Sequence, residues 1–196
     1  MRKFLAGFVL VVVAMVVTGC GSSGSSPVTP AGTVYLMGDE INSRELYLSW
    51  GVTFSPLSFT LVNTSEEDVV VKDIPIGFES TNSALFIQTA REFSLRESPY
   101  LDVYGRADRA TIGTGGAITA VFKGIVTIPK KGMKQFCLVN DVGIPFGWPA
   151  AATMSWRAFV APGTIKAVGI TSGREMKIEG DTVFGPIVRM DDGGKG

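Results

Sequence analysis

Apolar and polar residues alternate along several short stretches of the chain, and this period of two is the feature that most constrains its fold. In the stretch 117–128 the even positions are apolar or small, whereas the odd positions include Thr119, Lys123 and Thr127. Successive side chains of a β-strand point to opposite faces, so one face of this strand is expected to pack inward. Similar patterns predict strands over 34–37, 45–50, 57–61, 69–76, 136–139, 154–160, 165–171, 175–178 and 182–188.

Turn-forming residues lie between these stretches. Glycine and asparagine tolerate positive φ, and proline offers no N–H to a strand ladder, so such residues favour turns between consecutive antiparallel strands. Many short strands separated by turns predict an all-β fold, either a small barrel or, as we expect here, a single antiparallel β-sandwich. Only 82–96 has helical character, and at most a turn or two is expected there. The predicted turns are 63–65, 113–116, 129–132, 162–163, 172–173 and 180–181.

Residues 1–19 have the composition of an export signal. Arg2 and Lys3 precede the apolar run 4–17, which ends in the small residues Thr18 and Gly19. A charged start, a short apolar segment and a small-residue exit are typical of a secretory signal peptide. The run is shorter than the roughly 20 apolar residues that a bilayer-spanning helix needs. We therefore expect residues 1–19 to be removed from the mature protein.

The last four residues of this segment, Val17-Thr18-Gly19-Cys20, resemble the lipobox of bacterial lipoproteins. In that motif an aliphatic residue and two small residues precede a modified cysteine. The resemblance implies that Cys20 becomes the first mature residue, with diacylglycerol on its sulfur and often a third acyl chain on its amine. Two or three acyl chains anchor a protein lastingly, whereas a single chain holds it weakly. The expected location is the extracytoplasmic side of the cell membrane or outer membrane, and Gly21 favours the outer membrane because it replaces the aspartate associated with inner-membrane retention.

The two ends of the mature chain are expected to remain outside the folded body. After Cys20, the segment to Gly32 consists mainly of uncharged glycine, serine, proline and threonine, which bury too little apolar area to order themselves. Residues 191–196 are polar and glycine-rich, and are expected to be disordered. The predicted organisation is a signal peptide (1–19), a lipidated cysteine with a flexible tether (20–32), a β-sandwich domain (33–190) and a disordered tail (191–196).

One stretch carries a further resemblance. Residues 57–65, Leu-Ser-Phe-Thr-Leu-Val-Asn-Thr-Ser, followed by the apolar return 69–74, are similar to the second and third strands of bacterial immunoglobulin-like sandwich domains. The likeness covers only this stretch, and the chain has no cysteine–tryptophan–cysteine core. It implies an immunoglobulin-like sandwich that serves as a binding or assembly module.

Composition excludes several classes of chemistry. The 18 basic and 18 acidic side chains balance, so the net charge gives no reason to expect nucleic-acid binding. Removal of Arg2 and Lys3 with the signal peptide leaves a mature net charge of 16 − 18 = −2. Histidine is absent, which removes the commonest zinc ligand and the central member of serine and cysteine triads. Cys137 lies in the apolar run 135–139 and is predicted to be a small buried hydrophobic residue. No cofactor or metal is expected, and the protein is predicted not to be an enzyme.

The loop 143–149 holds the most unusual binding candidates, Phe146 and Trp148, between two prolines. Such aromatic rings can stack on a sugar ring or fill a partner's pocket, but we favour the alternative that they plug the end of the sandwich. The predicted function is a non-catalytic, membrane-anchored lipoprotein whose sandwich binds or scaffolds an envelope protein or a surface glycan. The alternatives are an enzyme acting on envelope polysaccharide and a carrier with an apolar cavity between its sheets. The enzyme would use paired carboxylates drawn from Asp39, Glu40, Glu66, Glu67, Asp68, Asp73, Asp102 and Asp141.

Overall fold

The computed structural model describes residues 32–39, 45–48, 54–89, 91–97, 102–112, 117–140 and 154–190. Several predictions fall on other parts of the chain and lie outside the described residues. These are the signal peptide, Cys20 and the tether, the turn at 113–116, the loop with Phe146 and Trp148, and the tail 191–196.

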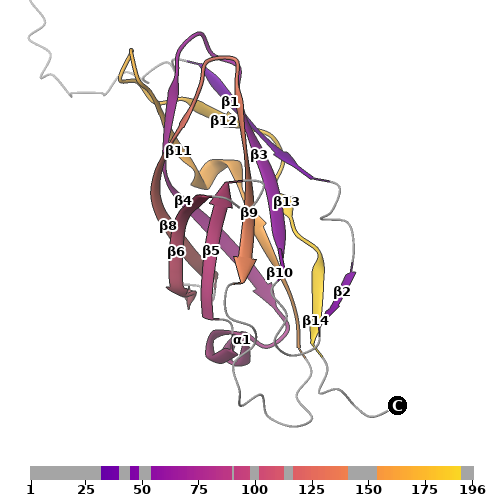
Figure 1. Cartoon of the computed structure of the whole chain (residues 1–196). Coiled ribbons are helices and arrows are strands. Elements are labelled where there is room, and N and C mark those ends of the chain that lie inside the picture. The colour runs from indigo at the N-terminus through magenta and orange to yellow at the C-terminus, as the bar shows by residue number, and fades with distance from the viewer. Residues whose placement is uncertain are drawn as a thin grey trace, which may run out of the picture.

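The described residues form two β-sheets that pack face to face (Figure 1). The first sheet has six strands in the order β12-β1-β3-β9-β5-β6, and the second follows the path β2-β14-β10-β4-β8-β7, with β11 beside β4 and β13 beside β10. The prediction of an all-β sandwich is therefore confirmed. The elements are β1 (Thr33–Gly38), β2 (Glu45–Leu48), β3 (Leu57–Asn63), β4 (Val69–Ser80), α1 (Ser83–Thr89), β5 (Arg91–Glu97), β6 (Asp102–Arg109), β7 (Thr111–Ile112), β8 (Ile118–Ile128), β9 (Met133–Asn140), β10 (Met154–Val160), the 3₁₀-helix η2 (Pro162–Thr164), β11 (Lys166–Gly169), β12 (Lys177–Glu179), β13 (Val183–Phe184) and β14 (Ile187–Met190).

Two pairings depart from the expected antiparallel arrangement. Strand β12 pairs with β1 in parallel, and β2 pairs with β14 in parallel. Each of these pairs joins segments that are far apart in the sequence. Alternation shows which side chains face the core, but it carries no information about which distant strand lies beside an edge, so these two pairs could not be foreseen.

The helical expectation for 82–96 is met in its first half only. Helix α1 is seven residues long, and β5 follows it as a strand between β9 and β6. Asn82 caps the helix, because its side-chain oxygen accepts a hydrogen bond from the Leu85 N–H at 3.0 Å. Strand β5 was not predicted, although Phe93 and Leu95 alternate with polar residues, because it falls in the stretch interpreted as helical. Strand β6 was also missed.

The inner faces of the sheets are filled by aliphatic and aromatic side chains. Trp156 lies in a cluster of four phenylalanines, with ring centroids 5.2 Å from Phe86 and 6.1 Å from Phe78, and Phe59 stacks on Phe136 at 5.3 Å. Burial of one such large side chain contributes about 1.5–3 kcal/mol. The alternation predicted for 154–160 is observed, because Met154, Trp156, Ala158 and Val160 are all buried. The cluster is completed by Phe54 and Phe93.

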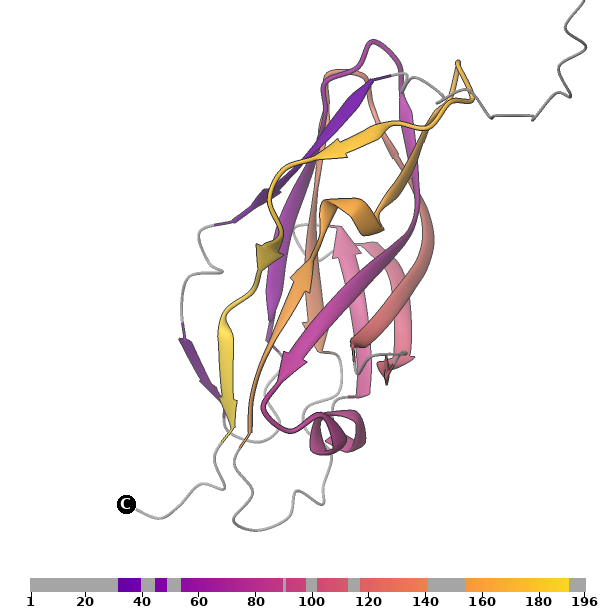
Figure 2. The same cartoon turned by 180° about the vertical axis from the view of Figure 1, so that it is seen from behind.

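Both lateral sides of the sandwich are bridged. On one side β6 crosses β8, where a Cβ atom added to Gly105 would lie 2.7 Å from the Lys123 carbonyl oxygen. The Tyr104 hydroxyl donates a hydrogen bond to the Gly124 carbonyl oxygen at 3.1 Å at this crossing. On the other side, the C-terminal segment passes from β12 in the first sheet to β13 and β14 in the second (Figure 2).

The two ends of the sandwich differ. At one end the chain enters β1, and the Thr64 N–H and hydroxyl donate to the Thr33 carbonyl oxygen at 3.2 and 2.9 Å. The loops 64–68 and 129–132 lie at this entry end, and α1 lies at the opposite end (Figures 1 and 2). The 12-residue strand β4 runs from the entry end to α1, a distance of about 40 Å at the usual rise of a strand.

Candidate functional site

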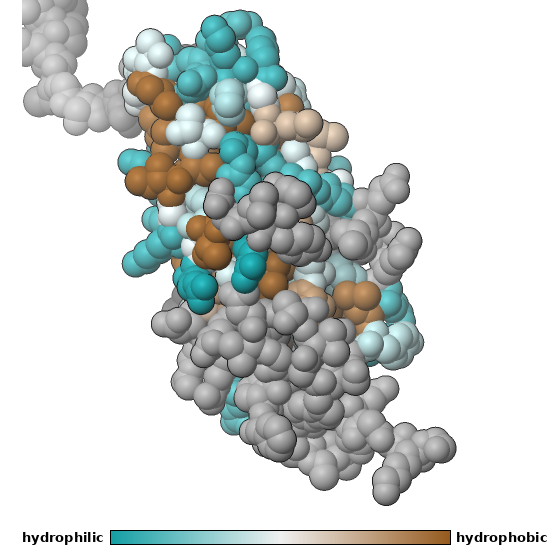
Figure 3. Space-filling view, in the orientation of Figure 1, coloured by the Kyte–Doolittle hydropathy of each residue, from teal (hydrophilic) through white to brown (hydrophobic). Residues whose placement is uncertain are grey.

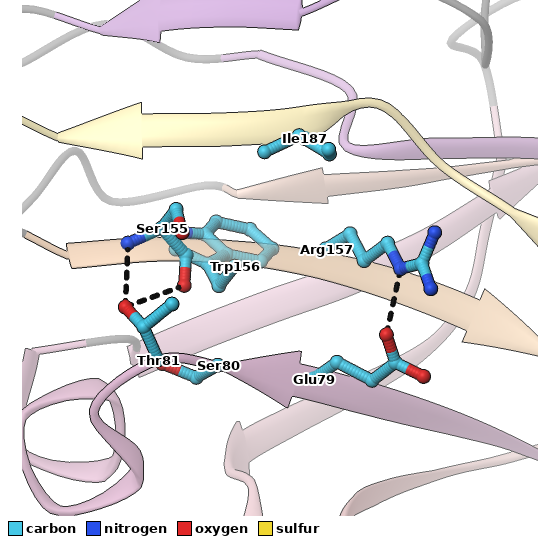
Figure 4. Close-up of a pocket in the computed structure, with 7 residues that line it drawn as sticks. All are labelled: Glu79, Ser80, Thr81, Ser155, Trp156, Arg157 and Ile187. Carbon is cyan, nitrogen blue, oxygen red and sulfur yellow. Dashed lines mark hydrogen bonds and ion pairs between the residues drawn. The ribbon is translucent and has the colours of Figure 1, made fainter.

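A groove lies on the outer face of the eight-stranded sheet, where β4 ends beside β10 (Figure 4). Its volume is about 430 Å³. Because β4 ends at α1, the groove belongs to the half of the sandwich away from the entry end. The described residues that line it are Glu79, Ser80, Thr81, Ser155, Trp156, Arg157 and Ile187.

Strand alternation and register place these side chains together. The inward positions of β10 are taken by core residues, so Ser155 and Arg157 face outward. Arg157 lies directly opposite Glu79 on β4, and Trp156 lies opposite Ser80. The strand at Trp156, whose ring is buried in the core, forms the floor of the groove, and Ile187 on β14 lies along its other side (Figure 4).

An ion pair marks one half of the groove. Arg157 Nε donates to Glu79 Oε2 at 2.7 Å, and both side chains remain partly exposed. The guanidinium carbon of Arg157 lies 4.1 Å from the centroid of the Phe184 ring, within the range of a cation–π contact. Phe184 in turn packs against Phe159 at 5.6 Å between centroids. The position of Arg157 is therefore set both by a carboxylate and by an aromatic ring.

The other half of the groove is held by Thr81. Its N–H donates to the Ser155 carbonyl oxygen at 2.9 Å, and its hydroxyl oxygen accepts the Ser155 N–H at 3.0 Å. These bonds attach the end of β4 to the start of β10. They leave the Ser155 hydroxyl without a partner among the described residues.

Three kinds of polar group in the groove are uncommitted within the described part of the chain. They are Glu79 Oε1, the two terminal nitrogens of Arg157 and the Ser155 hydroxyl, none of which has a protein partner there. The groove thus presents an acceptor beside several donors, with a hydroxyl two residues away along β10. This arrangement can form hydrogen bonds to a ligand, but the described residues supply only one carboxylate.

Several other acidic residues have separate local partners. Glu45 binds Arg189 through two bonds of 3.1 Å, and this guanidinium holds the pKa of Glu45 below its ordinary value. Glu66 pairs with Lys131 at 2.6 Å, and Asp68 accepts the Lys130 N–H at 2.8 Å. Within the described segments, no three side chains of histidine, cysteine, aspartate or glutamate lie close enough together to hold a metal ion.

A second polar cluster surrounds Asn63, which is fully buried. Its amide nitrogen donates to the carbonyl oxygens of Glu67, Ile128 and Pro129 at 2.8, 3.2 and 3.0 Å. Its side-chain oxygen accepts the N–H and the hydroxyl of Ser65 at 3.0 and 2.6 Å. The Asn-Thr-Ser stretch therefore forms the predicted connection between β3 and β4, and it also fixes the turn between β8 and β9.

Cys137 is not in the core, contrary to the sequence prediction. The neighbouring Phe136 and Leu138 face inward, so the alternation of β9 turns Cys137 to the outer face, where it is half-buried. Its sulfur lies 3.4 Å from the Ser58 hydroxyl, which donates to Asp39. The prediction was wrong because Phe136 and Leu138, which do face inward, lie on either side of Cys137 and make the whole run apolar.

The outer face of the six-stranded sheet carries exposed side chains of both kinds. Tyr35 and Met133 are 40% and 69% exposed, and both lie opposite Val62 in the strand register. Hydrophobic and hydrophilic residues are interspersed over the upper part of this face (Figure 3). We therefore place the candidate site on the other sheet.

The groove residues were missed at the sequence level, although part of the signal was present. Ser155 and Arg157 occupy the outward positions of a correctly predicted strand. Their apposition to Glu79 depends on the register between β4 and β10, which the sequence does not reveal. The predicted site residues Cys20, Phe146 and Trp148 lie outside the described residues, so their roles stay predictions.

Comparisons with known proteins do not place the chain in a family. No protein-family model matches it, and no curated protein matches it either. A solved structure, the ASH / PapD-like domain of human CEP192 (PapD-like domain 7), is similar over 90% of this chain and 95% of that one, with 11% identity and a TM-score of 0.28. So low a score supports no argument about function, and the sandwich architecture rests on the strand pairings. Within the described segments, none of the helices has the length and apolarity needed to traverse a bilayer.

Proposed function

We propose that this protein is a lipid-anchored envelope protein, attached through Cys20, whose β-sandwich binds another envelope component without catalysing a reaction. The observation that carries the proposal is the lipobox-like stretch Val17-Thr18-Gly19-Cys20 at the end of a short apolar segment. The bound component is an envelope protein or a surface glycan, and the groove between β4 and β10 is the surface that receives it.

The position of the groove supports this arrangement. The chain enters the sandwich at the end opposite α1, and the groove lies toward α1. The twelve residues 21–32 can span at most about 40 Å. A lipid at Cys20 would therefore attach the body through its entry end, which is the end farther from the groove.

The chemistry of the groove supports binding rather than hydrolysis. Glycosidases that use two carboxyl groups place them roughly 5–9.5 Å apart across the scissile bond. Glu79 is the single carboxylate among the described residues of the groove, and it already pairs with Arg157. The space between the sheets is occupied by the core side chains, which disfavours a carrier of apolar ligands.

Metabolic labelling with a fatty acid tests the anchor. We expect the wild-type chain to incorporate the label and to fractionate with membranes, and Cys20→Ser to lose both properties. Cys137→Ser is the matched control, because it removes the other cysteine and should leave the labelling unchanged. Labelling of Cys20→Ser at the wild-type level would contradict the proposal.

A further inference from the structure

We infer that the groove formed by Glu79, Ser155, Arg157 and Ile187 binds a neutral saccharide. The inference rests on the proposed function, because it assigns a ligand class to the same surface. It follows from the charge, the uncommitted hydrogen-bonding groups and the shape of the groove.

The charge of the groove favours an uncharged ligand. Arg157 and Glu79 are held 2.7 Å apart and neutralise each other. An anionic ligand would compete with Glu79 for the guanidinium, and a cationic ligand would compete with Arg157 for the carboxylate. Either would leave one member of the pair with its charge uncompensated at the contact. A neutral ligand keeps the pair intact.

The free polar groups favour a ligand that donates and accepts at neighbouring atoms. Glu79 Oε1 can only accept a hydrogen bond, whereas the terminal nitrogens of Arg157 can only donate. Adjacent hydroxyl groups of a sugar satisfy both, because each hydroxyl is a donor and an acceptor. Hydrogen bonds to charged groups are also stronger than those between neutral groups.

The shape of the groove suits a ring with polar edges and an apolar face. Ile187, 37% exposed, provides an apolar surface beside the ion pair. The Ser155 hydroxyl lies two residues from Arg157 along β10, a separation of about 7 Å, so a second polar contact is available further along the groove. The groove is open to solvent, whereas drug-like apolar ligands are largely enclosed by their pockets.

An extended peptide fits this surface less well. Peptides that add to a sheet gain affinity from main-chain hydrogen bonds at a free strand edge. In the groove β10 is already paired with β4 on one side and with β13 and β14 on the other. A peptide there would have to bind through its side chains alone.

The full-length protein, purified in a detergent without a sugar headgroup, can be tested on an array of immobilised neutral and acidic oligosaccharides. We expect binding to at least one neutral oligosaccharide, and a loss of at least about tenfold in Arg157→Ala and in Glu79→Ala. Lys177→Ala is the matched control, since it breaks an exposed ion pair of similar kind, Lys177–Glu179, on the other sheet. The control should bind like the wild type.

A conservative variant tests the charge argument separately. Glu79→Gln leaves Arg157 without its carboxylate, so we expect weaker binding to neutral oligosaccharides and stronger binding to acidic ones. The inference is overturned if the wild type binds no oligosaccharide, binds only acidic ones, or binds equally well after both alanine substitutions. Because fatty-acid labelling of Cys20 is measured independently, a failure here leaves the anchor unaffected.

Discussion

The cluster around Asn63 and the groove around Arg157 are both built from polar side chains, yet they use them in opposite ways. At Asn63 every side-chain donor and acceptor is bonded to the protein, and the residue is fully buried. In the groove, half of the Glu79 carboxylate, the terminal nitrogens of Arg157 and the Ser155 hydroxyl have no partner among the described residues. A buried polar group must be bonded to avoid a desolvation cost, whereas an exposed one is hydrated and remains available to a ligand. The first cluster therefore stabilises the fold, and the second is suited to recognition.

The largest effect is expected at Asn63. Replacement by alanine leaves the carbonyl oxygens of Glu67, Ile128 and Pro129 without this donor, and should lower the free energy of unfolding by about 3 kcal/mol or more. Denaturant titration measures the change. Asn82→Ala is the matched control, because it removes an exposed helix cap that is worth only about 1 kcal/mol. Equal losses of unfolding free energy in the two variants would contradict a special structural role for the Asn63 cluster.

A smaller effect is expected at the crossing of β6 and β8. Tyr104→Phe removes the hydrogen bond to the Gly124 carbonyl oxygen and should lower the free energy of unfolding by about 1 kcal/mol. Burial and the nearby charge of Asp73 raise the pKa of Tyr104 to about 12. Since the unfolded tyrosine ionises near 10, this contribution is complete below about pH 10 and is lost as the pH rises toward 12. Across this pH range, the free energy of unfolding should fall more steeply in the wild type than in Tyr104→Phe. Identical pH profiles for the two proteins would contradict the raised pKa of Tyr104.

Substitution of Glu67 should have a weaker effect on stability, and this effect should appear at acidic pH. Its carboxylate accepts hydrogen bonds from Ser172 and from the Thr171 N–H, and these hold the pKa of Glu67 below its ordinary value. The stabilisation is present above the pKa of an unfolded glutamate and is lost as the pH falls through the lower folded value. Glu67→Gln should reduce the acid dependence of the unfolding free energy. An unchanged acid limb would show that this loop contributes nothing through ionisation.

The smallest effect on stability is expected for Arg157→Ala. Exposed ion pairs contribute about 0–1 kcal/mol, so the melting temperature should shift little even though ligand binding is lost. A loss comparable with that of Asn63→Ala would assign Arg157 to the fold and remove the contrast between the two clusters.

The sequence indicated much of this fold and less of the site. Alternation in 117–128 and 154–160 correctly placed two strands and their buried faces, because burial of one sheet face leaves a period of two in the sequence. The Asn63 turn was also visible, since asparagine forms local bonds with its own backbone. The parallel edge pairs and the apposition of Arg157 to Glu79 were not visible, because they depend on the register of strands distant in sequence.

Site-specific photo-crosslinking in intact cells tests the central claim most directly. A photoreactive residue at Ile187, which lines the groove, should yield a discrete adduct with an envelope component, and Arg157→Ala in the same chain should abolish it. The same residue at Met133, which is exposed on the opposite sheet, should yield no such adduct. Adducts of equal yield from both positions, or none from Ile187, would contradict a role for the groove in binding.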